Sequence, residues 1–245
     1  MLILAIETTG SISSVALNNG ECITEIKNTD SYSHLQQLVP MVKQLMDEEG
    51  ADPANLDAVA VSMGPGSFTG IRIGMATAKG LAQIWNKPIV EVPTLADFAF
   101  RDYDWEEEGK NLLYCPVLDA KMHQVYAAAY AKNCKEPVVP GGAYGIDEYL
   151  QMLDGAFAGY DAAVFFGDGV KVYKEALENC GLECAFAPEE DSCQTAFGIA
   201  RLGAELFAEG KIKSCFDAQP EYYRLPEAER KLKEKQKAAE SAAQK

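Results

Sequence analysis

The sequence predicts an α/β protein with two lobes, because each half of the chain opens with paired strands and continues with alternating helices and strands. In the first half the predicted order is three strands, a helix, a strand, a helix, a strand and a helix. A similar order returns in the second half, and 245 residues are enough for two lobes. We therefore expect a duplicated β-β-β-α-β-α topology with one sheet in each lobe.

Three strands are predicted at the start of the chain. Residues 2–7 form an apolar, strand-favouring run, residues 14–17 follow a polar turn, and residues 21–27 alternate polar and apolar side chains. Asn19 and Gly20 stand before the third run, and an Asn-Gly step favours a tight hairpin because both residues tolerate positive φ. The second and third strands are therefore expected to pair.

A helix is predicted over residues 33–49. Ser33 suits the N-cap position, and Gly50 ends the helix. Pro40 lies inside it and is expected to kink it by removing one backbone hydrogen bond. The apolar residues recur at helical spacing and form one stripe, which consists of Leu35, Leu38, Val42 and Leu45.

The other elements follow from apolar runs bounded by Gly, Pro and polar residues. The first lobe, residues 1–105, continues with strands at 56–62 and 88–92 and helices at 68–85 and 94–103, and an acidic connector follows at 102–110. The second lobe, residues 106–225, has strands at 112–119, 124–130 and 162–166 and helices at 146–153, 170–179 and 195–209. The tail at 226–245 is rich in Lys, Glu, Ala and Gln and is predicted to be helical or disordered.

The charge of the chain argues against independent binding to nucleic acid. Lys and Arg number 22 against 37 Asp and Glu, which gives a formal net charge of −15, and only the tail is mildly basic. Met1 leads directly into an apolar strand without signal-peptide features, and no apolar run is long enough to span a membrane. The seven cysteines are odd in number and scattered, which favours reduced thiols. We therefore expect a cytoplasmic protein without membrane contact.

Two glycine-containing turns are candidate phosphate-binding loops. Residues 64–70 join a predicted strand to a predicted helix, whose N-terminus offers unpaired N–H groups to an anion, and residues 167–169 repeat the arrangement. Neither turn matches a Walker A loop. Each turn is therefore open to two interpretations, a loop that binds phosphate or a turn without a ligand. A third candidate is the first strand's end, where a carboxylate and hydroxyls meet. The candidate nucleotide-binding residues are Glu7, Thr8, Gly64, Gly66, Ser67, Gly167 and Gly169.

Small residues form a stripe on the predicted helix 68–85. Gly70, Gly74, Ala78 and Ala82 recur at helical spacing and would allow another helix to approach closely. The stripe serves either two ordinary core helices or a surface that binds another protein, and an exposed apolar patch would mark the second case. The candidate interface residues on helices 33–49 and 68–85 are Leu35, Leu38, Val39, Val42, Ile71, Gly74, Met75 and Ala78.

The residues give little support to metal or nucleophile chemistry. His34 and His123 are the only histidines, and neither has a His or Cys neighbour at ligand spacing. Cys180 and Cys184 do not form a C-x-x-C pair, and neither a G-x-S-x-G elbow nor an H-E-x-x-H motif occurs. We therefore expect no metal site and no catalytic residue.

Four segments together resemble the TsaB (YeaZ) family. They are Ile-Glu-Thr-Thr at 6–9, the eleven-residue run Gly-Pro-Gly-Ser-Phe-Thr-Gly-Ile-Arg-Ile-Gly at 64–74, Asp-Ala-Lys with Val-Tyr at 119–126, and Pro-Glu-Tyr-Tyr-Arg at 220–224. Their order and spacing match the family along residues 1–225, and the glycine run is the most specific of them.

The resemblance implies the ASKHA-type fold of actin, sugar kinases and Hsp70. It also implies a part in making threonylcarbamoyladenosine beside the anticodon of tRNA. In that system the metal-bearing paralogue TsaD transfers the group to tRNA, and a small ATPase, TsaE, joins the assembly. The resemblance implies direct pairing with the TsaD-type protein through helices 33–49 and 68–85, a homodimer when the chain is alone, and tRNA contact only through the complex.

The resemblance also implies what this chain lacks. TsaD proteins carry a His-x-x-x-His pair after a strand like residues 88–92, and Thr94 and Phe98 stand at those positions here. Neither side chain can replace an imidazole ligand. The chain is therefore expected to bind no metal and to be no enzyme by itself. No cofactor is required, and contact with ATP or ADP is expected to be weak or completed by a partner.

We accordingly expect a non-catalytic dimerisation or scaffold subunit of the tRNA-modifying complex. The alternative is a small-molecule kinase or ATPase of the same fold, for which Glu7, Asp119 and Asp168 are the candidate carboxylate bases. A direct RNA-binding module is disfavoured by the acidic charge of the chain.

Overall fold

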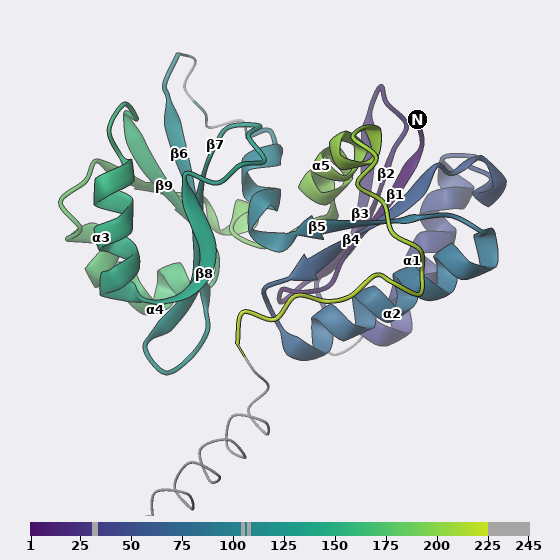
Figure 1. Ribbon diagram of the computed structural model, residues 1–245, viewed down its shortest axis with the longest axis horizontal. Coiled ribbons are helices and arrows are strands. Elements are labelled where there is room, and N and C mark those ends of the chain that lie inside the picture. Colours follow the sequence, from purple (N-terminus) through teal and green to yellow (C-terminus); the bar gives the residue numbers. More distant parts are fainter. Residues whose placement is uncertain (31–33, 104–105, 107–108, 225–245) are drawn as a thin grey trace, which may run out of the picture.

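The computed structural model describes residues 1–30, 34–103, 106 and 109–224, which form two lobes side by side (Figure 1). Each lobe contains one five-stranded sheet, so the predicted two-lobed α/β fold is confirmed. The predicted N-cap Ser33 and the predicted tail at 226–245 lie outside the described residues.

The first sheet mixes antiparallel and parallel pairs. Its strands are β1 (Ile3–Glu7), β2 (Ser13–Asn18), β3 (Ile23–Asn28), β4 (Ala58–Gly64) and β5 (Ile89–Pro93), in the spatial order β3-β2-β1-β4-β5. β1, β2 and β3 form an antiparallel meander, whereas β4 runs parallel to β1 and β5 parallel to β4. A short 3-10 helix, η1 (Pro53–Asn55), precedes β4.

The second sheet repeats this arrangement, which confirms the predicted duplication. Its strands are β6 (Leu112–Asp119), β7 (Gln124–Ala131), β8 (Val139–Gly145), β9 (Ala162–Phe166) and β10 (Cys184–Phe186), in the order β10-β9-β6-β7-β8. The sequence analysis missed β8 and β10. β8 contains a Pro and several Gly, which disfavour strands, and β10 is only three residues long.

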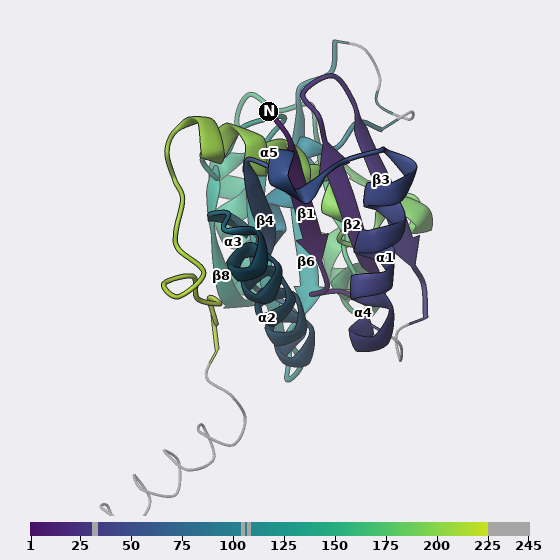
Figure 2. The ribbon, with the colours of Figure 1, turned by 90° about the vertical axis from the view of Figure 1, so that its right-hand side faces the viewer.

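Two helices cover one face of the first sheet. α1 (His34–Glu48) and α2 (Phe68–Trp85) lie side by side in front of its strands in Figure 2. Leu4 and Ile6 of β1 point toward them, because alternate side chains of a strand face opposite sides of its sheet. The apolar stripe of α1 and the inner face of α2 complete this core with Leu38, Met41, Val42, Leu45, Met75, Ala78 and Ala82.

The second sheet is covered by α3 (Ile146–Ala156) and α4 (Gly169–Glu178). Tyr149 and Leu153 of α3 and Leu177 of α4 are buried against its apolar residues. A 3-10 turn, η3 (Glu189–Asp191), follows β10. In the part of the chain that the structure describes, no helix has the length and apolar character needed to cross a membrane.

The two lobes share a core. The segment predicted as an α-helix at 94–103 is instead a 3-10 helix, η2 (Thr94–Phe100), and all of its residues are buried. Its Phe98 ring lies 5.2 Å from that of Phe166 in the second sheet, and Tyr114 packs in the same cluster. Packing between the lobes therefore places their inner walls relative to each other.

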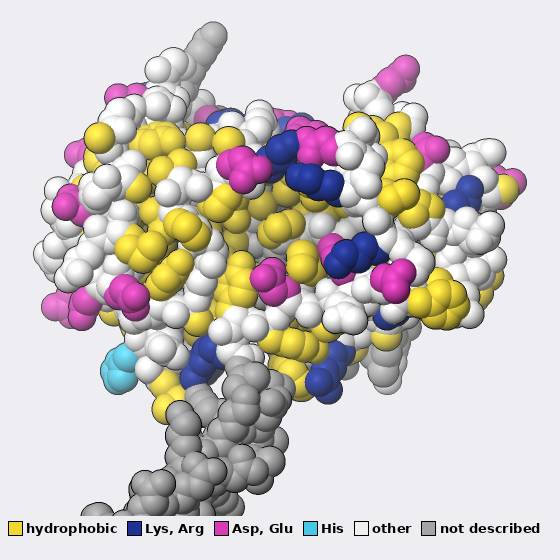
Figure 3. Space-filling view, in the orientation of Figure 1, with side chains coloured by type: hydrophobic (Ala, Val, Ile, Leu, Met, Phe, Trp, Pro, Cys, Tyr) yellow, Lys and Arg dark blue, Asp and Glu magenta, His cyan; other side chains and the backbone are white. Residues whose placement is uncertain are grey.

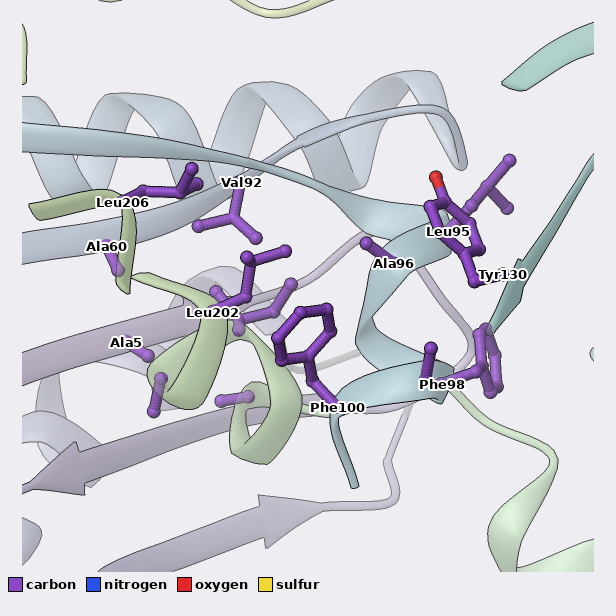
Figure 4. Packing of buried hydrophobic residues seen from close by; sticks show 14 of the residues in the cluster. Ala5, Ala60, Val92, Leu95, Ala96, Phe98, Phe100, Tyr130, Leu202 and Leu206 are labelled. Carbon is purple, nitrogen blue, oxygen red and sulfur yellow. The ribbon is translucent and has the colours of Figure 1, made fainter. Parts of the chain in front are cut away.

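The last helix, α5 (Ala196–Ala208), packs on the first sheet, although the division of the sequence at residue 106 places it in the second lobe. It covers the face opposite to α1 and α2. Figure 4 shows Leu202 and Leu206 of α5 beside Ala60 and Val92 of the sheet. Alanines on this face leave room for the helix to approach closely.

Side chains of the first lobe bind the N-terminus of α5. Both carboxylate oxygens of Asp97 are used, because they accept the N–H groups of Thr195 at 3.0 Å and of Gly198 at 3.1 Å. Two further acceptors complete the cap, since Ser14 Oγ accepts Ala196 N–H at 2.7 Å and Glu25 Oε1 accepts Phe197 N–H at 3.1 Å. These bonds satisfy amides that a helix start leaves unpaired, and they explain why α5 belongs to the first lobe.

Asp97 is fully buried and also pairs with Arg101, whose Nη2 lies 3.4 Å from Oδ2. Burial raises the pKa of Asp97 to about 6, and the Arg101 charge and the hydrogen bonds from the start of α5 offset the rise only in part. A buried charge without its partner is strongly unfavourable.

We expect Asp97→Ala to lower the free energy of unfolding at pH 7.5 by about 3–5 kcal/mol, because it leaves Arg101 uncompensated and α5 uncapped. Urea denaturation followed by circular dichroism measures this. The matched control is Asp102→Ala, which breaks the exposed pair with Arg201 and should change stability by at most about 1 kcal/mol. Equal losses in the two variants would contradict this account of the α5 cap.

Candidate functional site

A cleft of about 670 Å³ lies between the lobes. It forms at the carboxyl ends of the parallel central strands of both sheets, where open α/β folds commonly bind ligands. The first lobe contributes the turns after β1 and β4, and the second contributes the ends of β6 and β9 and the segment before α5. The lining residues are Thr9, Gly10, Ser11, Gly66, Ser67, Phe68, Leu118, Asp119, Ala120, Lys121, Tyr126, Gly167, Asp168, Val170, Lys171, Ala187, Glu189, Ser192, Cys193 and Gln194.

The structure brings only some of the predicted nucleotide-binding residues to this cleft. Gly66, Ser67 and Gly167 line it. The other predicted residues are buried behind the wall and do not line it; they are Glu7, Thr8, Gly64 and Gly169. The sequence analysis missed the segment that contributes Cys193 and Gln194, because only the return of α5 to the first lobe brings that segment beside Gly10 and Ser11.

Four of the five charged side chains that line the cleft form two ion pairs. Lys121 Nζ lies 2.5 Å from Asp119 Oδ2, and Lys171 pairs with Glu189. Asp168 Oδ1 accepts the backbone N–H of Asp119 at 2.9 Å. The hydrogen bonds from Lys121 hold the pKa of Asp119 below its usual value despite its partial burial. An anion in the cleft would have to compete with these carboxylates for the lysines.

The remaining groups could hold a polar molecule that contains a ring. Ser67 Oγ caps α2 by accepting the N–H of Gly70 at 3.3 Å, which places the positive end of that helix at the cleft. Gln194 contributes a side-chain amide and is buried, with only 6% of its surface exposed. The rings of Phe68 and Tyr126 supply apolar surface on the two walls. The cleft therefore offers both polar groups and apolar ring surface to a bound molecule.

Glu7 lies behind the cleft at the end of β1 and is fully buried. Its Oε1 accepts the backbone N–H of Thr9, whereas its Oε2 has no hydrogen-bond partner among the described residues. Burial raises the pKa of Glu7 to about 7, and the hydrogen bond from the backbone N–H of Thr9 lowers it only in part. The negative charge of Asp97 adds to the rise.

The positions matched to the histidine pair of TsaD are part of the core. Thr94 Oγ1 accepts the N–H of Gly64 at 3.1 Å, and Phe98 packs against Phe166. Both side chains are fully buried. Within the described residues, no three His, Cys, Asp or Glu side chains are grouped to hold a metal ion.

The predicted partner-interface residues must be corrected. Six of them are buried inside the first lobe, namely Leu38, Val42, Ile71, Gly74, Met75 and Ala78, and the side chain of Leu35 is not described. Val39 is exposed, with 51% of its surface accessible. The stripe of small residues on α2 faces inward, because a Cβ at Gly70 would lie 2.0 Å from the carbonyl oxygen of Thr8. The stripe therefore allows α2 to approach its own sheet.

The opposite face of α2 carries a shallow groove of about 550 Å³. Its lining residues are Phe68, Thr69, Arg72, Ile73, Ala76 and Thr77. The guanidinium of Arg72 lies 3.8 Å from the centre of the Phe68 ring, which orders both side chains at one end of the groove. We call this surface the α2 groove.

Two lobes whose sheets have corresponding strand orders, with a cleft between them, have the architecture of ASKHA-type proteins. Residues 26–194 match the family model of the tRNA N6-adenosine threonylcarbamoyltransferase, TsaD. The chain is 30% identical to the tRNA threonylcarbamoyladenosine biosynthesis protein TsaB of Escherichia coli, over 95% of this chain and 98% of that protein. It is 32% identical to TsaB of Bacillus subtilis, over 97% of this chain and all of that protein.

A solved structure agrees with these relatives. YeaZ from Pseudomonas aeruginosa has 26% sequence identity and a TM-score of 0.73, and the match covers 90% of this chain and 99% of that one. The chain belongs to the TsaB (YeaZ) family of tRNA threonylcarbamoyladenosine biosynthesis.

We expect Glu7→Gln to stabilise the protein at pH 8 by about 3 kcal/mol, because the wild-type must ionise a buried carboxyl that the variant lacks. The pKa of Glu7 is raised from 4.5 to about 7 in the folded state, so wild-type stability should fall as pH rises between these values. The gain should therefore vanish near pH 4.5. Denaturation at both pH values, with exposed Glu48→Gln as control, checks this; a pH-independent difference would contradict it.

Proposed function

We propose that this protein is a non-catalytic subunit of the threonylcarbamoyladenosine-forming complex and binds the TsaD-type transferase directly through the α2 groove. The observation that carries the proposal is this exposed groove on α2. Its position agrees with the pairing through helices 33–49 and 68–85 that the family resemblance implies. The names of the relatives place them in the same biosynthesis.

The groove suits a helix of a protein partner. Ala76 and Thr77 are small, so a helix can approach the backbone of α2 closely. Ile73 and the Phe68 ring supply apolar contact, and Arg72 can bind a carboxylate of the partner. Val39 is a further exposed apolar residue, on α1, which covers the same face of the sheet as α2. A self-complementary use of the same surface would give the homodimer expected when the chain is alone.

In this proposal the transferase holds the metal and the reacting group, and this chain supports it. The TsaE-type ATPase joins through the complex, in the cytoplasm, and tRNA is contacted only through the complex. Figure 3 shows Lys and Arg side chains dispersed among acidic ones on the face it presents, with no broad basic patch there. The net charge of −15 points the same way.

The cleft favours one second candidate, a small-molecule kinase or ATPase. Asp119 and Asp168 at its wall are the candidate bases that remain, since Glu7 is buried behind it. Titration calorimetry with MgATP and a phosphate-release assay discriminate the two functions. Turnover by the chain alone that Asp168→Asn abolishes would favour the enzyme. In the scaffold proposal ATP or ADP binds weakly, or only when a partner completes the site, and no cofactor is required.

We expect Ala76→Arg to weaken pairing with the TsaD-type protein from the same source by at least about 100-fold, because a long charged side chain fills the groove. Light scattering of the mixture measures the loss of the one-to-one complex. The matched control is Val172→Arg, which makes a similar change at an exposed apolar residue of α4 in the second lobe. Retained pairing in folded Ala76→Arg, or equal loss in both variants, would overturn the assignment of the surface.

A further inference from the structure

The last described segment, residues 218–224, lies along the boundary between the lobes, and we call it the strap. In Figure 1 this yellow-green segment passes in front of α2 and ends between the lobes. It contains the Pro-Glu-Tyr-Tyr-Arg run at 220–224, to which the proposed docking assigns no role.

The first half of the strap is fixed to the first lobe. Lys79 of α2 donates a hydrogen bond to the carbonyl oxygen of Ala218 at 2.9 Å. The backbone N–H of Glu221 donates to the carbonyl oxygen of Met63, at the end of β4, at 2.7 Å. These bonds connect the strap to the helix and the strand that form the first wall of the cleft.

The next residues of the strap contact one lobe after the other. Tyr222 contacts the first lobe, because its hydroxyl accepts a hydrogen bond from Arg72 Nε at 3.1 Å and its ring centre lies 5.1 Å from that of Phe68. Tyr223 contacts the second lobe, since its ring lies edge-on to Tyr126 with the ring centres 6.1 Å apart.

Gly141 of β8 and Arg224 complete the contact with the second lobe. A Cβ at Gly141 would lie 2.4 Å from the hydroxyl oxygen of Tyr223, so the absence of a side chain there makes room for the tyrosine. Arg224 Nη1 donates to the carbonyl oxygen of Ala120 at 2.5 Å, and its Nη2 lies 3.9 Å from Met122 Sδ. This charged hydrogen bond is the stronger kind of contact.

Each of Tyr222, Tyr223 and Arg224 contacts one residue that lines the cleft: Phe68 on the first wall, and Tyr126 and Ala120 on the second. We infer that the strap is a latch that joins the two walls of the cleft, and that releasing Tyr223 or Arg224 lets the cleft open. Both are positioning residues. The inference concerns the chain alone and does not depend on whether the proposed partner binds.

Cys193 provides a native reporter of the opening. It lines the cleft and is partly exposed, and its Sγ lies 3.6 Å from Ser11 Oγ on the first wall. Opening the walls should expose this thiol to a small alkylating reagent. Cys22 is exposed elsewhere and serves as an internal reference, whereas Cys115 is buried in the second sheet and reports general unfolding.

The experiment measures iodoacetamide alkylation of the full-length chain at each cysteine by peptide mass spectrometry. We expect Tyr223→Ala and Arg224→Gln each to raise the rate at Cys193 about tenfold, since one such contact shifts a two-state equilibrium by about that factor. The rate at Cys22 should not change. Tyr223→Phe keeps the ring and should behave as wild-type, as should Arg201→Gln, which removes a cation that pairs with Asp102 away from the strap.

An unchanged rate at Cys193 in folded Arg224→Gln would overturn the inference. An equal rise at Cys115 would also overturn it, because the variant would then be unfolding generally. If Tyr223→Ala fails to fold, Arg224→Gln decides alone, since its substitution leaves the aromatic contacts in place.

Discussion

One buried carboxylate connects the two places where the chain passes from one lobe to the other. Asp97 belongs to η2, which connects the two sheets, and it accepts the amides at the start of α5, where the chain returns from the second lobe to the first. Both crossings between the lobes are therefore joined at one side chain. Because α5 covers the alanine-rich face of the first sheet, that lobe has a complete core only when α5 packs on it. The same return brings Cys193 and Gln194 to the cleft, so the cap of a helix also determines one wall of the candidate site.

One face of α2 packs inside the first lobe and the other is exposed, and the positions of its glycines decide which face is buried. Gly70 and Gly74 lie against Thr8, so the smooth side of the helix is used for packing inside the lobe. The side that remains outside has Ala76, Thr77 and an ordered Arg72–Phe68 pair, which is the composition of a contact surface with little side-chain entropy to lose. Phe68 lies at the junction of this groove, the strap and the cleft, so these three features share one side chain.

Local sequence patterns predicted the bounds of those helices and strands that depend on neighbouring residues alone. The bounds of α2 and of β6 and β9 agree with the apolar runs, because each run ends at a Gly, Pro or polar turn. β8 was missed because strand propensity fails for a Gly- and Pro-containing segment that pairing with β7 holds in place. Gly66, Ser67 and Gly167 line the cleft because turns after central strands converge there, and their role in binding a nucleotide stays a prediction. The lobe to which α5 belongs could not be predicted, since its partner Asp97 is distant in sequence. Nor could periodicity tell whether the stripe of small residues on α2 is buried in the lobe or lies on its surface.

The return of α5 also has a consequence for synthesis of the protein. Translation proceeds at about 5–20 residues per second, so the ribosome needs about 5–20 s to make the residues between η2 and the end of α5. During that time β1, β2, β4 and β5 can pair, but the face that holds Ala5, Ala60 and Val92 has no helix to cover it. The nascent first lobe therefore presents an apolar sheet face to the solvent until most of the chain has emerged. Such a surface is a natural binding site for a ribosome-associated chaperone, and the lobes complete their folding together rather than in sequence.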